Sequence, residues 1–231
     1  MKTIALIAAA GSGKRMESGQ DAKPFLELGG KPILAYVLER FVGSAAVDEV
    51  VLVVKEKYID KAAELVALHG FGKIAGIFPG ADSRTGSVNN GIEAIEAEND
   101  DIVVIHDGVR PFITEPVIRA AVDSAAAHGA AVVGVPCTAT IKSVGKGNVI
   151  EGTPDRKKLW EAQTPQAFRY GIIKKAYGAS RGKALTDDSC LVERMGHKVR
   201  MVMGDVTNIK VTVPADLTVA EAILNENRDR V

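Results

Sequence analysis

Residues 3–16 read TIALIAAAGSGKRM, in which an apolar run of strand length, residues 3–9, leads into a glycine-rich loop. Further runs of this kind lie at residues 49–54, 74–78, 102–106, 131–135 and 198–203. They are mostly apolar throughout rather than alternating with polar residues. Such runs are typical of strands that are buried on both faces of a parallel sheet.

Helical patterns lie between these strands. Residues 33–42, for example, place Leu34, Val37, Leu38 and Phe41 along one stripe of a helix. Further helices are expected at residues 57–68, 83–97, 115–128, 171–180, 187–195 and 215–227. Alternating strands and helices predict an α/β fold, with a mostly parallel, Rossmann-like sheet and helices on both of its faces.

Residues 137–158, CTATIKSVGKGNVIEGTPDRKK, interrupt this alternation. Two short β-like runs, at 140–144 and 148–151, flank the turn Gly145-Lys146-Gly147. This pattern predicts a β-hairpin arm inserted into a single domain that spans residues 1–231. The arm is too polar to bury itself, so it is expected to lie over a ligand, to pack on another subunit, or to extend into solvent without a functional role.

The composition excludes several classes of protein. The 231 residues are 46% hydrophobic and 25% charged, as in an ordinary globular domain. Because 29 Lys and Arg residues balance 29 Asp and Glu residues, no net charge draws the surface to nucleic acid or to an anionic membrane. The uncharged stretch 124–141 contains Gly129 and Pro136 and is not a membrane span. The two cysteines, Cys137 and Cys190, have no zinc spacing and indicate a cytoplasmic location.

The loop after the first strand is a place where α/β folds bind phosphate. A Walker A loop requires Gly at position 8 and Ser or Thr at position 15, where this chain has Ala8 and Arg15. A dinucleotide fingerprint requires a third glycine at the position of Met16. Small residues and cations suited to a triphosphate remain, namely Gly11, Gly13, Lys14, Arg15 and Lys23. The alternative is a tight turn with solvated lysines.

Further expectations follow from the local pattern of the chain. The apolar run 102–106 ends at Asp107, which places this carboxylate at the carboxyl end of a strand, where open α/β sheets bind ligands. His106 is expected to be a packed residue. Residues 208–212, NIKVT, are predicted to form a short strand whose alternation points Lys210 away from its two apolar neighbours. Either Asp82 or Ser83 is expected to cap the helix that follows it.

Seven blocks carry a resemblance to a known family. AAAGSGKRM is followed by KPFLELGGKPIL, PGADSRTGSVNNGI, HDGVRPF, WEAQTPQAF, LTDDSCLVE and NIKVTVPADL, over residues 8–217. In this order they resemble the 2-C-methyl-D-erythritol 4-phosphate cytidylyltransferases of the non-mevalonate isoprenoid pathway. The resemblance implies a fold of the nucleotide-diphospho-sugar transferase type and transfer of the cytidylyl group of CTP to a polyol phosphate. It also implies Mg²⁺ as cofactor and a homodimer clasped through the hairpin arm.

The resemblance also implies roles for individual residues. The implied catalytic residues are Arg15, Lys23 and Lys210. Those implied to bind the nucleotide are Ala9, Ala10, Gly11, Gly13, Gly80 and Ser87. Those implied to bind the acceptor are Asp107, Gly108, Arg110, Thr140, Arg156, Thr164 and Thr186, and Asp107 is also a candidate magnesium ligand. Because Thr140 and Arg156 lie on the arm, each active site is expected to combine residues of two subunits. Cys190 is expected to be structural.

Two other functions compete with this interpretation. Ribitol 5-phosphate cytidylyltransferase shares the fold, the nucleotide and the chemistry, although the AAAG start and the WEAQTPQ block favour the methylerythritol enzyme. A nucleotide-binding regulatory module without turnover is the second alternative. The presence of both the triphosphate cations and the acceptor residues argues against it, because a sensor needs no second phosphate site.

Overall fold

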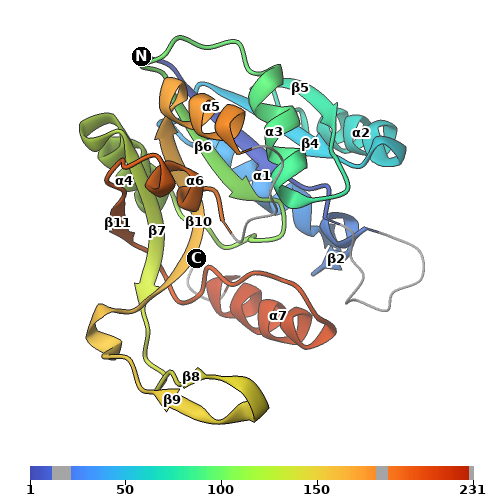
Figure 1. Cartoon of the computed structure of the whole chain (residues 1–231). Helices are drawn as coiled ribbons and strands as arrows, with labels where there is room; N and C mark the ends of the chain where they lie inside the picture. Colours follow the sequence, from blue (N-terminus) through green and yellow to red (C-terminus); the bar gives the residue numbers. More distant parts are fainter. Residues whose placement is uncertain (12–21, 181–186, 229–231) are drawn as a thin grey trace.

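A computed structural model describes residues 1–11, 22–180 and 187–228 of the chain. Within these ranges, seven strands form one sheet in the order β11-β7-β10-β6-β1-β4-β5 (Figure 1). All neighbouring pairs are parallel except the two that involve β10. The predicted mostly parallel α/β sheet is therefore confirmed. Its strands are β1 (Thr3–Ala8), β4 (Glu49–Val54), β5 (Ile74–Pro79), β6 (Ile102–Asp107), β7 (Ala130–Pro136), β10 (Trp160–Arg169) and β11 (Arg200–Met203).

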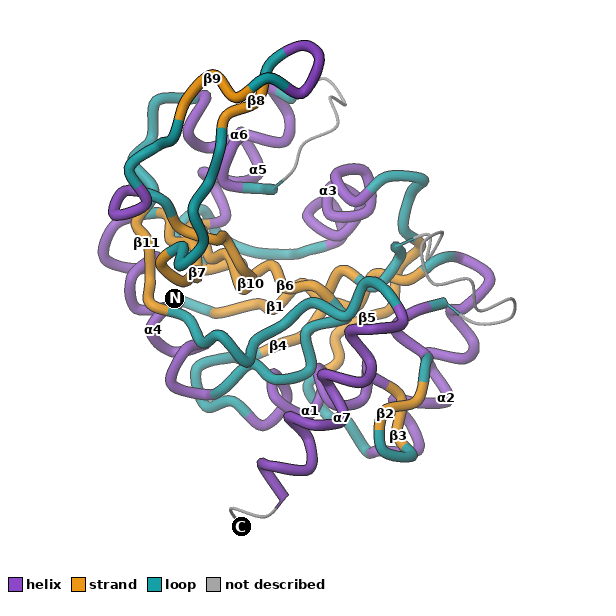
Figure 2. The backbone as a smooth tube through the Cα atoms, turned by 90° about the horizontal axis from the view of Figure 1, so that it is seen from below, coloured by secondary structure: helices purple, strands orange, loops and turns teal. Residues whose placement is uncertain are grey.

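Helices cover both faces of this sheet, as Figure 2 shows. One face carries α1 (Ile33–Gly43), α2 (Ile59–His69) and α4 (Glu115–His128), and the other carries α3 (Arg84–Ala94), α5 (Tyr170–Ala179) and α6 (Ser189–Arg194). Alternate strand residues divide between the two layers, because successive side chains of a strand point to opposite faces. Ala5 and Ile7 of β1 pack on the first layer, while Ile4 and Leu6 pack on the second. This double burial is the reason for the uniformly apolar strands.

A third, smaller apolar cluster holds the C-terminal helix α7 (Pro214–Arg228) against the body. It includes Leu28 of the short strand β2 (Glu27–Leu28), which pairs with β3 (Lys31–Pro32). Val211 and Ala220 are fully buried in the same cluster, so the segment that enters α7 is fixed from both sides. Within the described ranges, every helix is too short or too polar to span a bilayer.

Strand β10 is absent from the sequence-based prediction, although it lies between β6 and β7 and is antiparallel to both. Its sequence, WEAQTPQAFR, has polar residues at several positions and lacks an apolar run. A register shift between Ala162 and Gln166 further disturbs its pairing with β7. Its polar side chains are satisfied by tertiary hydrogen bonds; for example, Gln166 Oε1 accepts the N–H groups of Asp188 and Ser189 at the start of α6. Periodicity could not reveal these partners.

The prediction of a strand at residues 208–212 is wrong. Val211 donates its N–H to the carbonyl of Val109, but the segment forms no ladder with a neighbouring strand. The alternation nevertheless holds, because Val211 is buried while Lys210 points the other way, to Asp107. Separate contacts hold the segment in place of a sheet: Arg110 donates to the carbonyl oxygen of Asn208, and Asp216 accepts the N–H groups of Thr212 and Val213.

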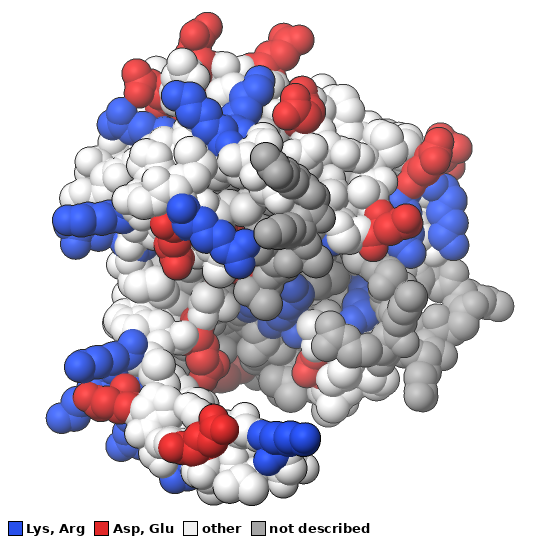
Figure 3. Space-filling model, in the orientation of Figure 1, with Lys and Arg blue, Asp and Glu red and all other residues white. Residues whose placement is uncertain are grey.

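The segment between β7 and β10 stands out from the body as a separate lobe (Figures 1 and 3). It contains the two-stranded hairpin of β8 (Ser143–Val144) and β9 (Ile150–Gly152). Figure 3 shows charged side chains of both signs on this lobe. Its apolar side chains Ile141, Val144, Val149 and Ile150 are exposed in the single chain.

Candidate functional site

A pocket of about 310 Å³, called here the main pocket, opens at the carboxyl ends of β1 and β6. The strand order changes direction at this point, since β4 lies on one side of β1 and β6 on the other. Open α/β sheets bind ligands in this position because loops diverge there and leave a crevice. The pocket is lined by Ala8, Ala9, Ala10, Gly11, Lys23, Pro24, Asp82, Ser83, Arg84, Ser87, Asp107, Val109, Lys210, Val211 and Thr212.

One wall of the main pocket is the turn that leads into α3. Ser83 is the helix N-cap, and its Oγ accepts the N–H of Gly86 at 3.0 Å. The hydroxyl of Ser87 accepts the N–H of Ala81 at 3.0 Å and lies 2.8 Å from the carbonyl oxygen of Ser83. Gly80 stands directly behind this wall, where an added Cβ would come within 2.3 Å of the Cβ of Ala10. The wall is therefore rigid and closely packed.

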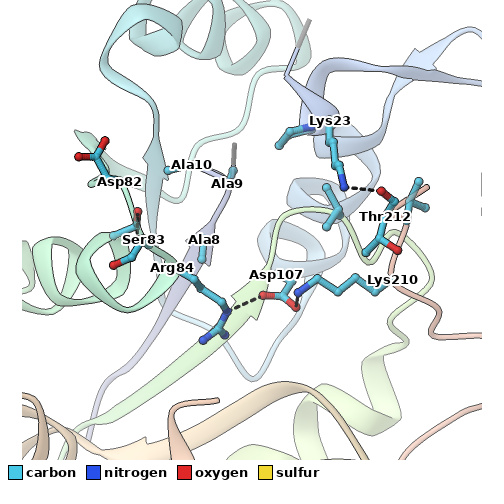
Figure 4. A pocket seen from close by; sticks show the side chains of 15 residues that line it. Ala8, Ala9, Ala10, Lys23, Asp82, Ser83, Arg84, Asp107, Lys210 and Thr212 are labelled. Carbon is cyan, nitrogen blue, oxygen red and sulfur yellow. Dashed lines mark hydrogen bonds and ion pairs between the residues drawn. The ribbon is translucent and has the colours of Figure 1, made fainter. Parts of the chain in front are cut away.

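The opposite wall carries Lys23, which belongs to a one-turn helix, Lys23–Phe25. Its Nζ donates to the carbonyl oxygen of Thr212 (Figure 4). Thr212 is in turn held by Asp216, whose carboxylate accepts the N–H groups of Thr212 at 2.6 Å and of Val213 at 2.9 Å. Burial raises the pKa of Asp216, but these hydrogen bonds and Thr212 Oγ1 outweigh it, so the pKa is lowered. The ammonium of Lys23 is thus held at the pocket by backbone.

Asp107 is the centre of the charged cluster. Arg84 Nε lies 3.0 Å from its Oδ1, and Lys210 Nζ lies 2.7 Å from its Oδ2. These two bases approach the carboxylate from opposite sides, as Figure 4 shows. Arg110 Nε adds a third cation at 3.6 Å from Oδ2. Burial alone would raise the pKa of Asp107, but Arg84 and Lys210 hold it well below its usual range. The carboxylate is therefore charged and fixed on both oxygens.

The histidine next to Asp107 is fully buried, as predicted for a packed residue. Its Nε2 lies 3.2 Å from the carbonyl oxygen of Arg110, which can only accept, so Nε2 carries the proton. Nδ1 of His106 must then accept the hydroxyl proton of Thr164, at 3.1 Å. The Thr164 oxygen in turn accepts the N–H of Asp107, also at 3.1 Å. Burial lowers the pKa of His106 to about 3, so the ring is neutral.

Two smaller pockets adjoin the main pocket. The side pocket, of about 270 Å³, is lined by Arg84, Asp107, Arg110, Ala162, Gln163, Thr164, Gln166, Asp187 and Lys210. The arm-root pocket, of about 290 Å³, is lined by Arg110, Val135, Pro136, Thr138, Glu161, Ala162, Gln163, Val206, Asn208, Ile209 and Lys210. Arg84, Asp107 and Lys210 line both the main pocket and the side pocket. This cluster therefore marks the junction of two cavities.

Most of the residues predicted from the sequence meet at these cavities. Those that line the main or side pocket are Ala9, Ala10, Gly11, Lys23, Ser87, Asp107, Arg110, Thr164 and Lys210. Gly80 and Gly108 lie behind the lining, where a Cβ on either would press against Ala10 or Ala9. Gly13, Arg15 and Thr186 lie outside the described residues.

The two arm residues are not part of these cavities. Thr140 and Arg156 are exposed, and Arg156 Nη1 donates to the carbonyl oxygen of Thr138 at 3.2 Å. Neither side chain lines the main, side or arm-root pocket of the single chain. Thr138 itself lines the arm-root pocket, so the base of the arm borders the cavities while its tip stands away from them.

Sequence reasoning missed Arg84 as a functional residue. Its only signal is its place in the quoted block PGADSRTGSVNNGI, directly after the N-cap of α3. Its partner Asp188 is 104 positions away, and a pairing of this kind has no trace in local periodicity. Burial lowers the pKa of Arg84, but the carboxylates of Asp188 and Asp107 outweigh it, so the pKa is raised. Arg84 is therefore a permanent cation at the junction.

A divalent cation requires several oxygen, nitrogen or sulfur ligands that converge on one point. Within the described ranges, no three His, Cys, Asp or Glu side chains come together as a metal-binding group. Both oxygens of Asp107 are already paired with basic side chains. The described protein groups by themselves therefore fit a metal ion poorly.

The sequence and the fold were compared with known proteins. A model of the family described as 2-C-methyl-D-erythritol 4-phosphate cytidylyltransferase matches residues 3–226. A relative of that name from Geotalea uraniireducens is 48% identical over 229 residues, which cover 97% of each chain. Another from Halalkalibacterium halodurans is 43% identical over 232 residues and covers both chains completely.

Solved structures agree with the sequence comparison. The crystal structure of 4-diphosphocytidyl-2C-methyl-D-erythritol synthase from Anaerococcus prevotii has a TM-score of 0.86 and 29% identity, and the match covers 97% of this chain and 96% of that chain. The crystal structure of 2-C-methyl-D-erythritol 4-phosphate cytidylyltransferase from Thermus thermophilus has a TM-score of 0.77 and 28% identity, and the match covers 97% of this chain and 100% of that chain. The chain is thus similar to these proteins over nearly its whole length.

Proposed function

The chain belongs to the 2-C-methyl-D-erythritol 4-phosphate cytidylyltransferase family, and we propose on that premise how its own residues carry out the reaction. It is a nucleotidyltransferase that transfers the cytidylyl group of CTP to 2-C-methyl-D-erythritol 4-phosphate in isoprenoid biosynthesis. The products are 4-diphosphocytidyl-2-C-methyl-D-erythritol and pyrophosphate. The observation that carries the assignment of roles is the cluster of Arg84, Asp107 and Lys210 between two cavities.

The reaction needs little acid–base chemistry from the protein. An oxygen of the acceptor phosphate, ionised at neutral pH, forms a bond to the α-phosphorus of CTP. The bond from that phosphorus to the bridging oxygen of the β-phosphate breaks, and its electron pair leaves with pyrophosphate. The site must therefore align two phosphates and stabilise the negative charge that grows in the transition state. Fixed cations are the main means of doing so.

The main pocket is proposed to bind CTP. The backbone of Ala9, Ala10 and Gly11 would approach the nucleotide closely, since small residues end β1 there. The packed wall of Gly80 and Ser87 would read the cytosine and exclude a purine by size. Lys23, held at the opposite wall, would neutralise the triphosphate, and Arg15 is assigned the same role by resemblance.

The side pocket is proposed to bind the acceptor. Arg110 and Lys210 would hold its phosphate next to the α-phosphate of CTP, because both border the junction. The hydroxyl proton of Thr164 is committed to His106, so Thr164 can only accept a hydrogen bond from the substrate. It would therefore contact a hydroxyl of the polyol rather than its phosphate. Thr186, Gly108 and the Asp107 carboxylate complete the acceptor site by resemblance.

Magnesium is proposed as a companion of CTP rather than as a resident of the protein. When bound, it would neutralise the triphosphate, and its ligands would be chiefly phosphate oxygens and water, as is usual for this ion. Asp107 is the candidate protein ligand. To bind the metal, its carboxylate would have to give up its contact with Arg84 or with Lys210.

We propose that the enzyme is a cytoplasmic homodimer joined through the arm. The exposed apolar side chains of the arm support this assembly, because a single chain leaves them in water. Under two-fold symmetry, Thr140 and Arg156 of one subunit would complete the acceptor site of the other. Mixed dimers of Lys23→Ala and Arg156→Ala subunits should then recover activity, because one site of each heterodimer is intact. Verified heterodimers without recovery would place Arg156 in its own subunit's site.

The function is tested by following pyrophosphate release from CTP. The purified chain is incubated with 2-C-methyl-D-erythritol 4-phosphate and, separately, with ribitol 5-phosphate. Release with the first acceptor and little with the second is the expected result. Comparable or faster release with ribitol 5-phosphate would contradict the acceptor assignment, and no release with either would contradict the proposed function.

A further inference from the structure

Arg84 is held from behind by a second carboxylate, Asp188, at the N-cap of α6. Its Nη1 and Nη2 donate to the two oxygens of Asp188 at 2.9 and 2.8 Å, a bidentate pair. The hydroxyl of Tyr177, on α5, donates to Oδ1 of the same carboxylate at 2.5 Å. The Asp188 side chain is only 2% exposed. Both of its oxygens thus accept hydrogen bonds from donors on α3 and α5.

The backbone of Asp188 is fixed as well. Gln166, on β10, accepts the N–H of Asp188 at 3.2 Å and the N–H of Ser189 at 3.0 Å through a single oxygen, Oε1. Its amide nitrogen donates to Asp187 Oδ2 at 3.1 Å. Gln166 is itself fully enclosed in the sheet between β6 and β7. Strand β10 therefore sets the position of the Asp188 backbone independently of Tyr177.

This arrangement fixes the orientation of Arg84. A guanidinium has five N–H donors in a rigid plane, and the described carboxylates occupy three of them. Because Asp188 takes the two terminal nitrogens, Nε is the nitrogen that faces Asp107. The N-cap at Ser83 fixes the start of the helix that carries Arg84. The guanidinium is held at both of its ends.

Asp188 itself cannot touch a substrate, because it is buried and does not line the main or side pocket. Stability alone does not require it either. A buried ion pair gains little over well-packed apolar residues of the same shape, because taking both charges out of water is costly. Its contribution must be sought in the geometry that it imposes on Arg84.

We infer that Asp188 is a positioning residue for cytidylyl transfer: it holds Arg84 at the junction of the two pockets and, through Arg84, fixes the Asp107 carboxylate against Lys210. This inference rests on the proposed function. If Asp188 is replaced by Asn, Arg84 can turn both terminal nitrogens toward Asp107 or toward a phosphate. The first movement competes with Lys210 for Asp107, and the second leaves Asp107 to Lys210 and Arg110 alone. Either one shifts the cations that are to meet the acceptor.

The test compares Asp188→Asn with Asp101→Asn in the full-length enzyme. Asp101 is the matched control, a buried carboxylate that accepts the N–H groups of Lys2 and Glu98 at 2.6 and 2.9 Å. It precedes β6, whereas Asp107 ends it. Melting temperature, kcat, KM for both substrates and CTP binding by calorimetry are measured where each variant is folded. Asp188→Asn should lower kcat about 10²-fold, the cost of a misplacement near 1 Å, and leave CTP affinity nearly unchanged. Asp101→Asn should lower only the melting temperature.

A double-mutant cycle with Arg84→Met separates positioning from general stability. If Asp188 acts through Arg84, adding Asp188→Asn to Arg84→Met should cause no further loss of kcat, and it should raise the melting temperature by removing an unpaired buried charge. Additive losses of kcat would overturn the inference. An unchanged kcat in folded Asp188→Asn would do the same while leaving the proposed function intact. A wild-type enzyme that releases no pyrophosphate would instead contradict the proposed function.

Tyr177→Phe provides a milder variant should Asp188→Asn fold poorly. It removes one donor from Asp188 and almost no volume, and it leaves the bidentate pair with Arg84 in place. The kcat is expected to fall in the same direction but by less, again with unchanged CTP affinity. A loss of CTP affinity in this variant, without any change in kcat, would contradict the positioning role.

Discussion

Replacing Gly80 by alanine should damage the nucleotide site without touching any charged group. Gly80 follows β5, and its N–H donates to the carbonyl oxygen of Val54 at 2.7 Å, which fixes the backbone beside β4. A Cβ at this position would lie 2.3 Å from the Cβ of Ala10 and 2.9 Å from Oγ of Ser87. Both neighbours line the main pocket. The added methyl group has no room unless the pocket wall moves.

The size of the effect follows from these distances. Carbon atoms in contact are separated by about 3.5–4.0 Å, so Ala10 and residue 80 must move apart by more than about 1 Å. A displacement of that size at a substrate-positioning wall costs about 10²-fold in rate. Overpacking of this kind also costs about 1–3 kcal/mol of folding free energy. For a chain of this length the melting temperature should fall by roughly 2–12 °C.

The assay is steady-state kcat/KM for CTP, with the melting temperature measured in parallel. The matched control is Gly72→Ala, because a Cβ at Gly72 would have no atom within 4 Å. Gly80→Ala should lose about 10²-fold in kcat/KM for CTP, whereas the control should keep the wild-type value. A folded Gly80→Ala enzyme with kcat/KM within about two-fold of wild type would refute the close packing of the base wall that this reasoning assumes.

Four further predictions concern charge, pH, metal and nucleotide choice. Lys23→Ala should lower kcat about 10²-fold, by analogy with the loss of one oxyanion donor, and a raised KM for CTP with unchanged kcat would show that Lys23 binds only the ground state. Because the folded pKa of His106 is about 3 against 6.5 in the unfolded chain, stability should be fully present above pH 6.5 and decline as the pH falls toward 3. At pH 5 the free energy of unfolding of the wild type should be about 2 kcal/mol lower than at pH 7.5. His106→Gln should lack this pH-dependent decrease, which thermal unfolding at the two pH values measures. Treatment with EDTA should abolish pyrophosphate release and added Mg²⁺ should restore it, so full activity in EDTA would argue against a metal. ATP and GTP should be turned over far more slowly than CTP in the same assay, and comparable turnover would contradict a size-selective base wall.

The sequence alone determined the elements whose partners are close in the chain or uniform in kind. Strands buried on both faces must be apolar throughout, so β1, β4 and β6 were identified nearly to the residue. Helix α4 was predicted with its observed bounds, 115–128, because its apolar stripe ends at Gly129, which adopts a left-handed conformation. Asp107 was placed correctly for the same reason, as the first charge after an apolar run.

Tertiary structure decided the features that depend on distant partners. Strand β10 carries polar side chains, and it lies inside the sheet because its polar groups find distant partners. Its Gln166 accepts the N–H of Asp188, and its Thr164 carbonyl accepts the side-chain amide of Asn208. The segment of Lys210 is not a strand, because its hydrogen bonds go to Arg110, Val109 and Asp216 rather than to one neighbouring strand. Arg84 and Asp188 meet across 104 positions. Local periodicity records which face of an element is buried, whereas the partner that a buried polar group finds there is set by how the whole sheet brings its loops together.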